Sequence, residues 1–327
     1  MKIGFFTANF SEKPLEEVAK LAADFGYETL EIPAYEGNGQ LETAEMLEPG
    51  KADSIKKMVR SYGLGICALS NHSDSFLIMG PGGADTDFIY RGTPEEKIQH
   101  GTESLIRTAQ AANALEVPVV VGYPGVENWG RFFFFPYGQG WSEYEEQFAE
   151  RFTPILDKFQ EYGVKFAIEI HPNSFVYDTH TAERALELVG NHPCLGYNLD
   201  PANVLYLGLS AELLIDRLEG RIYHVHAKDA EMVEHNMPLG GALMQGDMRR
   251  LDRSFRFRIP GWGDVRWKKI ITELSMIGYE GAISYEHEDV TMSRMDGVRK
   301  TIEFLRPLII ENPYEGRQDK LFANDSI

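Results

Sequence analysis

The stretch VKFAIEIHPNS, residues 164–174, has the pattern of a buried β-strand that ends in polar side chains. Apolar residues occupy every second position from 164 to 170, which is the period of a strand. Glu169 and His171 close this apolar run, and Pro172 stops it. A carboxylate and an imidazole at such a place indicate that the strand opens onto a site.

The rest of the chain alternates short strand-like runs with longer helical patterns. Strands are expected at residues 3–7, 27–33, 65–70, 118–122, 164–170, 195–200, 222–227 and 281–289. Helices are expected at residues 14–25, 54–62, 94–115, 142–162, 181–189, 210–218, 264–277 and 292–310. Strands that alternate with helices indicate a parallel sheet, and eight such units predict an α/β fold of the (β/α)8 TIM barrel type.

Two connections are longer than a barrel needs. Residues 123–140 follow the fourth predicted strand and residues 230–263 follow the seventh, so both insertions leave the strand ends at which barrels build active sites. The second insertion carries five arginines among aromatic residues and is interpreted as a lid or a subunit contact. No linker divides the chain, so we expect one barrel domain over residues 1–310 and a C-terminal tail over residues 311–327.

Composition excludes several classes of partner. The formal net charge of −18 argues against nucleic acid, because binding to a phosphate backbone needs clustered basic residues. No segment has the length of a membrane span, and the N-terminal apolar run is too short for a secretory signal. Cys67 and Cys194 are predicted to be buried free thiols. We therefore expect a cytoplasmic protein without a membrane partner.

Four consecutive predicted strands end in potential metal ligands. Glu169 ends the fifth strand, Asp200 the sixth and Glu286 the eighth, while His226 lies in the seventh. In a barrel these side chains would meet at the mouth. Three carboxylates and one imidazole suit Mn²⁺, the favoured ion, or Mg²⁺ or Co²⁺, with Zn²⁺ less favoured. A divalent cation would also explain how neighbouring buried acids stay ionised.

Each of these residues also has a simpler interpretation. A lone glutamate at a strand end is usually a solvated rim residue, and a strand histidine is usually a hydrogen-bonded core residue. The dipeptide Asp200-Pro201 could mark only a turn. The coincidence of all four residues at successive strand ends favours the metal site.

The motifs EIH (169–171), NLDPAN (198–203), HVHAKD (224–229) and YEHED (285–289) resemble the sugar phosphate isomerase/epimerase family, the xylose isomerase-like barrels. The resemblance covers nearly the whole chain. It implies a metal held by Glu169, Asp200, His226 and Glu286, with the two glutamates as an acid/base pair. Two features depart from the family pattern: the insertions, and Asn203, where several epimerases have a histidine.

The same barrel resembles the catalytic α-subunit of bacterial C-glycoside deglycosidases. This second resemblance implies a metal-dependent carbon–carbon lyase that acts on 3-keto-C-glycosides, with His171 as the base and a smaller β-subunit as partner. Without that subunit, a homo-oligomer is expected.

Chemistry at such a site would begin with removal of a proton next to a sugar carbonyl, which gives an enediolate. Return of the proton to the opposite face would epimerise the sugar, return to the neighbouring carbon would isomerise it, and expulsion of a β-substituent would make the enzyme a lyase. Glu169, Glu286 and His171 are the candidate catalytic residues. Candidate contacts to a small sugar or keto-glycoside are Asn9, His72, Asn203 and Lys228, although Lys228 could instead pair with Asp229.

Two other classes of function stay open at this point. An abasic-site endonuclease shares the barrel, but the acidic net charge speaks against it. A non-catalytic sugar-binding barrel would not need all four candidate ligands. The chain has no Gly-rich phosphate cradle, which favours an unphosphorylated substrate.

Overall fold

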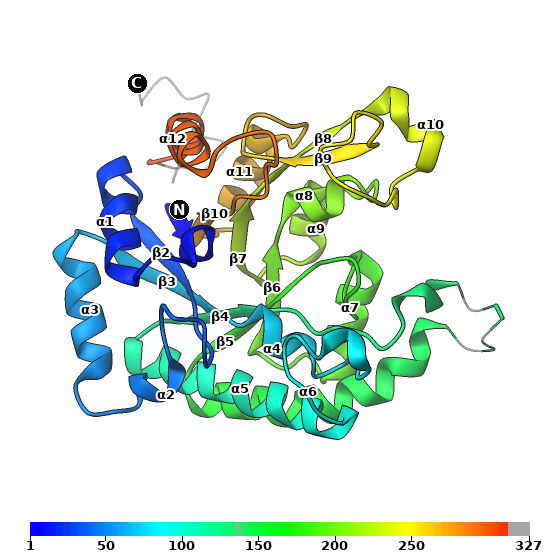
Figure 1. The fold of residues 1–327 in the computed structure, drawn as a ribbon, viewed down its shortest axis with the longest axis horizontal. Coiled ribbons are helices and arrows are strands. Elements are labelled where there is room, and N and C mark those ends of the chain that lie inside the picture. Colours follow the sequence, from blue (N-terminus) through cyan, green and yellow to red (C-terminus); the bar gives the residue numbers. More distant parts are fainter. Residues whose placement is uncertain (134, 137, 139, 313–327) are drawn as a thin grey trace, which may run out of the picture.

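The computed structural model describes residues 1–312 except 134, 137 and 139, and its centre is a closed parallel barrel surrounded by helices (Figure 1). The eight strands are β1 (Lys2–Phe6), β2 (Thr29–Pro33), β3 (Gly65–Ser70), β4 (Val119–Gly122), β5 (Lys165–Glu169), β6 (Leu195–Leu199), β7 (Ile222–Ala227) and β10 (Ala282–Tyr285). They follow one another around the barrel in chain order, and β10 pairs with β1 to close it, with Ile3 opposite Ile283. The predicted (β/α)8 fold is confirmed.

One main helix follows each strand. These helices are α1 (Leu15–Phe25), α3 (Lys51–Ser61), α5 (Pro94–Leu115), α6 (Glu145–Glu161), α7 (Thr179–Leu188), α9 (Ala211–Arg217), α11 (Trp267–Met276) and α12 (Arg294–Leu305). Helix α5 begins where expected because Thr93 and Glu96 form a capping box around Pro94. The helix expected over residues 292–310 ends earlier, at Leu305, and a 3-10 turn follows it.

Several short helices occupy the connections. The α-helical ones are α2 (Thr43–Met46), α4 (His72–Phe76), α8 (Pro201–Leu205) and α10 (Met237–Gly240). The 3-10 helices are Thr7–Phe10, Ala84–Thr86, Trp129–Phe132, Trp141–Tyr144, Glu234–Asn236 and Arg306–Leu308. The helix expected from residue 142 therefore starts as a 3-10 turn and becomes α6 at Glu145. The long connection over residues 71–93, which contains α4, was not predicted.

The two faces of strand β5 show how the barrel positions its polar residues. Phe166 points to the helix layer, where its ring packs against those of Phe152 and Phe159. Ala167 instead joins a small apolar cluster with Ala68, Val119 and Val121. Because side chains alternate along a strand, Glu169 shares the face of Ala167. The face away from the helices thus carries both this small cluster and the polar residues of the mouth.

The insertion after β7 contains a hairpin that was not predicted. Strands β8 (Asp229–Met232) and β9 (Phe255–Arg258) pair in antiparallel fashion, and they extend with α10 from one side of the barrel (Figure 1). Arg253, one of its five arginines, is buried and donates hydrogen bonds to backbone carbonyl groups of the same segment. That arginine is part of the insertion's internal structure.

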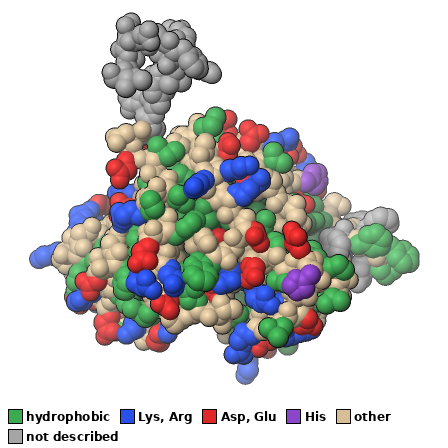
Figure 2. Space-filling model, turned by 90° about the horizontal axis from the view of Figure 1, so that it is seen from above, with side chains coloured by type: hydrophobic (Ala, Val, Ile, Leu, Met, Phe, Trp, Pro, Cys, Tyr) green, Lys and Arg blue, Asp and Glu red, His purple; other side chains and the backbone are tan. Residues whose placement is uncertain are grey.

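Other sequence expectations concern the surface and the chain ends. In the described residues, no helix is both long enough and apolar enough to cross a bilayer. Cys67 and Cys194 are free. On the face shown in Figure 2, Lys and Arg side chains are interspersed with Asp and Glu. The predicted tail lies outside the described residues from position 313 onward.

Candidate metal centre

The four residues predicted to share a metal come together at the carboxyl ends of β5, β6, β7 and β10. Glu169, Asp200, His226 and Glu286 each offer one ligand atom, and these atoms all lie within 4.8 Å of one another. The first three side chains are buried and Glu286 is partly exposed. The convergence follows from strand order, because β6 and β7 lie between β5 and β10 in the barrel.

The NLDPAN motif fixes the orientation of Asp200. Its Oδ1 accepts hydrogen bonds from the backbone N–H groups of Ala202 at 2.9 Å and Asn203 at 3.3 Å, so Asp200 is the N-cap of α8. Pro201 fits the first helical position because it has no N–H group to satisfy. With Oδ1 engaged in capping, Oδ2 is left to face the centre of the site.

Two other polar side chains hold Glu169 in place. Asn203 Nδ2 donates to Glu169 Oε1 at 2.7 Å, and His72 Nε2 lies 3.0 Å from Glu169 Oε2. Asn203 and His72 were predicted as substrate contacts, and the structure places both of them on this carboxylate. Their contact with substrate stays a prediction.

A further acidic residue, Glu31 of β2, contacts the candidate ligand His226 and was not predicted. Its Oε2 is 2.9 Å from His224 Nε2, and its Oε1 is 3.2 Å from His226 Nε2. The Glu31 side chain is fully buried. The sequence did carry a signal for it, because TLEIP (29–33) places one charge inside an apolar strand, as the opening stretch does with Glu169.

Lys228 contributes a buried ammonium group to the site. Its Nζ lies 2.8 Å from Asp200 Oδ2, 3.0 Å from Glu286 Oε2 and 3.4 Å from Glu288 Oε1. The alternative that Lys228 pairs with Asp229 is wrong. Successive side chains leave this segment in different directions, and Asp229 accepts hydrogen bonds from Gly261, Val265 and Trp267 at the base of the β8–β9 hairpin.

His171 and Asn9 lie at the edge of the site. The His171 ring is 5.0 Å from that of Tyr123, and its Nδ1 contacts the carbonyl oxygen of Pro172. Burial lowers the pKa of His171, although the charge of Glu169 opposes this effect. Asn9 joins the turn after β1 to the end of β10, because its amide donates to Tyr285 O at 3.1 Å and accepts from His287 N at 2.9 Å.

Electrostatics keep two of the candidate ligands ionised. Burial alone would raise the pKa of Glu286, but Lys228 and His226 outweigh it and hold that pKa well below its ordinary value. Burial likewise opposes ionisation of Glu169, and His226 and His72 together lower its pKa. At Asp200 burial is the stronger effect and raises the pKa. Carboxylates in so buried a place require compensating positive charge.

The unsatisfied atoms show that the site fits a divalent cation. Asp200 Oδ2, Glu286 Oε2 and His226 Nδ1 are buried and make no hydrogen bond with the described residues, although all three have ion-pair contacts. Buried polar atoms normally find a partner, and these atoms lie on the candidate ligands and point to one place. Carboxylate oxygens and one imidazole nitrogen are suitable donors for Mn²⁺, Mg²⁺ or Co²⁺.

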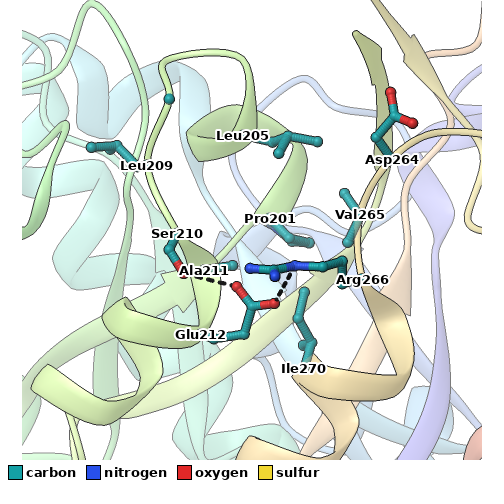
Figure 3. Close-up of a pocket in the computed structure, with 11 residues that line it drawn as sticks. Pro201, Leu205, Leu209, Ser210, Ala211, Glu212, Asp264, Val265, Arg266 and Ile270 are labelled. Atoms are coloured by element: carbon teal, nitrogen blue, oxygen red, sulfur yellow. Dashed lines mark hydrogen bonds and ion pairs between the residues drawn. The ribbon is translucent and has the colours of Figure 1, made fainter.

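A separate pocket lies between α8, α9 and α11 (Figure 3). Two of its charged side chains pair with each other: Arg266 Nε is 2.8 Å from Glu212 Oε1, and Ser210 donates to Glu212 Oε2 at 2.8 Å. None of the four candidate ligands lines this pocket. The barrel mouth is therefore the better candidate for chemistry.

Comparison with known proteins identifies the family. Residues 19–308 match the family model described as the xylose isomerase-like TIM barrel. The chain belongs to this family. The family resemblance predicted from the EIH, NLDPAN, HVHAKD and YEHED motifs is thereby confirmed.

Two relatives show how much of the chain is shared with other members of the family. The uncharacterized protein YfiH of Bacillus subtilis is 26% identical over 331 residues, which covers 94% of this chain and 99% of YfiH. An inosose dehydratase of Clostridium perfringens is 28% identical over 143 residues, which covers 43% of this chain and 46% of the dehydratase. The similarity to YfiH thus extends over nearly the whole chain, and that to the dehydratase over less than half of it.

Solved structures share the architecture. The probable 3-DHS dehydratase AsbF of Bacillus anthracis superposes with a TM-score of 0.67 at 18% identity and covers 94% of this chain and 99% of its own. A D-psicose 3-epimerase crystallised with D-fructose gives a TM-score of 0.63 at 16% identity, with 94% and 99% coverage. At these identities the similarity establishes the fold alone.

Proposed function

We propose that this protein is a divalent-metal-dependent enzyme that removes a proton next to the carbonyl group of a small sugar or keto-sugar. The observation that carries the proposal is the convergence of Glu169, Asp200, His226 and Glu286, three of which present buried ligand atoms without hydrogen bonds. A bound cation, most favourably Mn²⁺, would polarise the substrate carbonyl and stabilise the enediolate.

Glu169 and Glu286 are the proposed acid/base pair. They come from β5 and β10, which lie on opposite sides of β6 and β7, so their carboxylates approach the site from two directions. The lowered pKa of each carboxylate keeps both groups deprotonated in the free protein, which is the state a general base must be in. His171 is the alternative base, because its lowered pKa favours the neutral imidazole.

Lys228 favours an elimination over a simple epimerisation. Epimerisation needs removal and return of a carbon-bound proton, and isomerisation also moves a proton between two oxygens, whereas expulsion of a β-substituent needs a proton donor for the leaving group. The buried ammonium group, 3.0 Å from Glu286, is a donor of this kind. A relative named as an inosose dehydratase supports the same choice.

The same elimination chemistry applies to a second class of substrate, the 3-keto-C-glycosides. Loss of water from an inosose or keto-sugar and cleavage of a 3-keto-C-glycoside begin with the same proton abstraction. We therefore keep the C-glycoside lyase, with a smaller β-subunit as partner, as the second candidate.

The test is an NMR assay in D₂O with the Mn²⁺-reconstituted enzyme. After incubation the metal is removed, and a panel of free ketoses, inososes and 3-keto-C-glycosides is examined. We expect at least one substrate to lose its α-proton, seen as a dehydrated product or a released aglycone, and as deuterium at the α-carbon of recovered substrate where the abstraction is reversible. Deuterium without elimination would assign epimerase or isomerase chemistry, and a metal-loaded protein that neither exchanges the α-proton nor forms an elimination product with any of these compounds would contradict the proposal.

A further inference from the structure

Glu31 is a fully buried carboxylate for which the proposed chemistry has no direct use. It lies on β2, across the barrel from β7, and its two oxygens contact two different imidazoles. His224 and His226 reach the same carboxylate because residues two apart share one face of a strand. All three side chains are at most 1% exposed. A buried charged group with defined partners on both oxygens calls for a physical explanation.

The contact to His226 determines which of its ring nitrogens is available. Nε2 lies 3.2 Å from Glu31 Oε1, so an N–H group at Nε2 donates to this carboxylate. Nδ1 then faces the other side, 3.4 Å from Glu286 Oε2 and 3.6 Å from Glu169 Oε2. The ring of Phe6 stacks on the imidazole with centroids 5.7 Å apart and planes at 22°, which restricts rotation of the ring.

The second contact keeps Glu31 itself in place. His224 Nε2 lies 2.9 Å from Glu31 Oε2, so a change in the Glu31 rotamer would break both hydrogen bonds at once. The result is a chain of three side chains that runs from His224 through Glu31 to the ligand nitrogen of His226. Metal-ligating histidines commonly donate their second N–H group to a carboxylate, which fixes their tautomer and orientation.

We propose that Glu31 is a positioning residue that holds His226 with Nδ1 toward a bound divalent cation, and that His224 holds Glu31. This inference rests on the metal site of the proposed function. A purely structural cluster is the competing explanation, and it predicts that Glu31 affects folding stability without affecting metal affinity or the choice of ligand nitrogen.

The wild-type protein provides the first test. Long-range ¹H–¹⁵N spectra of protein labelled with ¹⁵N-histidine are recorded with Zn²⁺ as the probe, and His226 is assigned by the signals absent from His226→Gln. We expect the metal-induced shift at Nδ1 and a protonated Nε2. A shift at Nε2 would overturn the inference while leaving the metal site intact.

Substitutions provide the second test. For Glu31→Gln we expect an affinity for Mn²⁺ that is about 10- to 100-fold weaker, measured by competition with a chelator in protein shown to be folded by circular dichroism. His224→Gln should weaken affinity in the same direction but less. The matched control is Glu212→Gln, which alters a carboxylate in the pocket of Figure 3 and should leave affinity unchanged.

The outcomes separate the two proposals. Wild-type affinity in folded Glu31→Gln would overturn only the role of Glu31. A wild-type protein that takes up neither Mn²⁺ nor Zn²⁺ would contradict the proposed function, and this inference would fall with it.

Discussion

Lys228 places a permanent positive charge among residues that also suit a divalent cation. Its Nζ is within 3.0 Å of both Asp200 and Glu286, and its side chain is buried. Five acidic residues lie within ion-pair distance of this lysine or of His226: Glu31, Glu169, Asp200, Glu286 and Glu288. A divalent cation at the four ligands would offset much of this negative charge, and Lys228 would then be free to act on substrate rather than to neutralise the site.

Replacement of Lys228 by methionine separates these roles. We expect Lys228→Met to bind Mn²⁺ at least as tightly as the wild type, because a repelling charge is removed, while elimination falls by about 100-fold or more. Chelator competition measures the affinity and the D₂O assay measures turnover. Lys268→Met, at an exposed position, is the control, and a large loss of metal affinity in Lys228→Met would contradict the assignment.

Glu286→Gln should affect both metal and turnover. The substitution removes a candidate ligand oxygen and one of the two proposed acid/base groups, so we expect activity to be lost along with much of the bound metal. Metal analysis of the purified variant and the D₂O assay measure the two effects. Glu303→Gln, in an exposed pair with Arg299, should behave as wild type, and full activity in Glu286→Gln would refute the site.

The sequence predicted the candidate metal ligands because their places at strand ends determine where their side chains lie in the barrel. Alternation placed Glu169, Asp200, His226 and Glu286 at the mouth, and the structure brings them together. Side-chain partners were beyond such reasoning, because a strand or helix position fixes a face but not a rotamer. For this reason the hydrogen bond from Asn203 to Glu169 was not predicted. Glu31 was not predicted either, because its partners His224 and His226 lie on another strand, far away in the sequence.

At the scale of elements, the β8–β9 hairpin is fixed to the barrel. Asp229 accepts hydrogen bonds from four N–H groups at the base of the hairpin, and Gly263 packs so closely on it that no side chain would fit there. Arg258 binds Asp289 at 2.9 Å, which joins β9 to the segment after β10. Phe257 lies over Lys228, with Nζ 4.9 Å from the ring centre. The hairpin therefore forms one wall of the site.

Asp229→Ala should release this wall locally. The substitution leaves buried N–H groups without an acceptor, each at a cost of about 1–3 kcal/mol. We expect faster amide hydrogen exchange in β8, β9 and residues 259–265, with protection of β4 and β5 unchanged. Asp247→Ala removes an exposed carboxylate from the same insertion and is the control. Unchanged exchange in the hairpin of Asp229→Ala would contradict the anchoring role.

The sequence of the insertion contained part of this information. FRFR (255–258) alternates aromatic and charged residues, as a half-buried strand does. Its partner β8 begins only two residues after β7, and without a turn residue between them the two strands are hard to separate by pattern. The interpretation of this insertion rested on its arginines. In the structure its aromatic residues make packing contacts, such as the stacking of Phe255 on Tyr206 with ring centroids 4.0 Å apart.

At the scale of the whole molecule, stability and chemistry occupy different layers. The large apolar core lies between strands and helices, while the candidate metal centre lies at one end of the barrel interior. Active sites of this fold class lie at that end, and the rest of the barrel serves stability. Loss of the metal should therefore leave the fold intact.

Metal removal tests this separation. Protein treated with a chelator should keep its far-ultraviolet circular dichroism, and Mn²⁺ at 100 times its Kd should stabilise the folded state by about 2.7 kcal/mol through mass action. Thermal unfolding with and without Mn²⁺ measures the effect, and Glu286→Gln should show little of it. Unfolding upon metal removal would show that the centre is structural.

HVHAKD (224–229) has a consequence for redesign of this protein. Within six consecutive residues it supplies the partner of Glu31, a candidate metal ligand, the buried ammonium and the anchor of the hairpin. Barrel enzymes are good templates for loop exchange because function varies with the loops. Here, however, the hairpin cannot be transplanted as an independent module. A graft that omits Asp229 would lose the hydrogen bonds that hold the hairpin to the barrel. A graft that shifts the register of β7 by one residue would turn His226 away from the mouth.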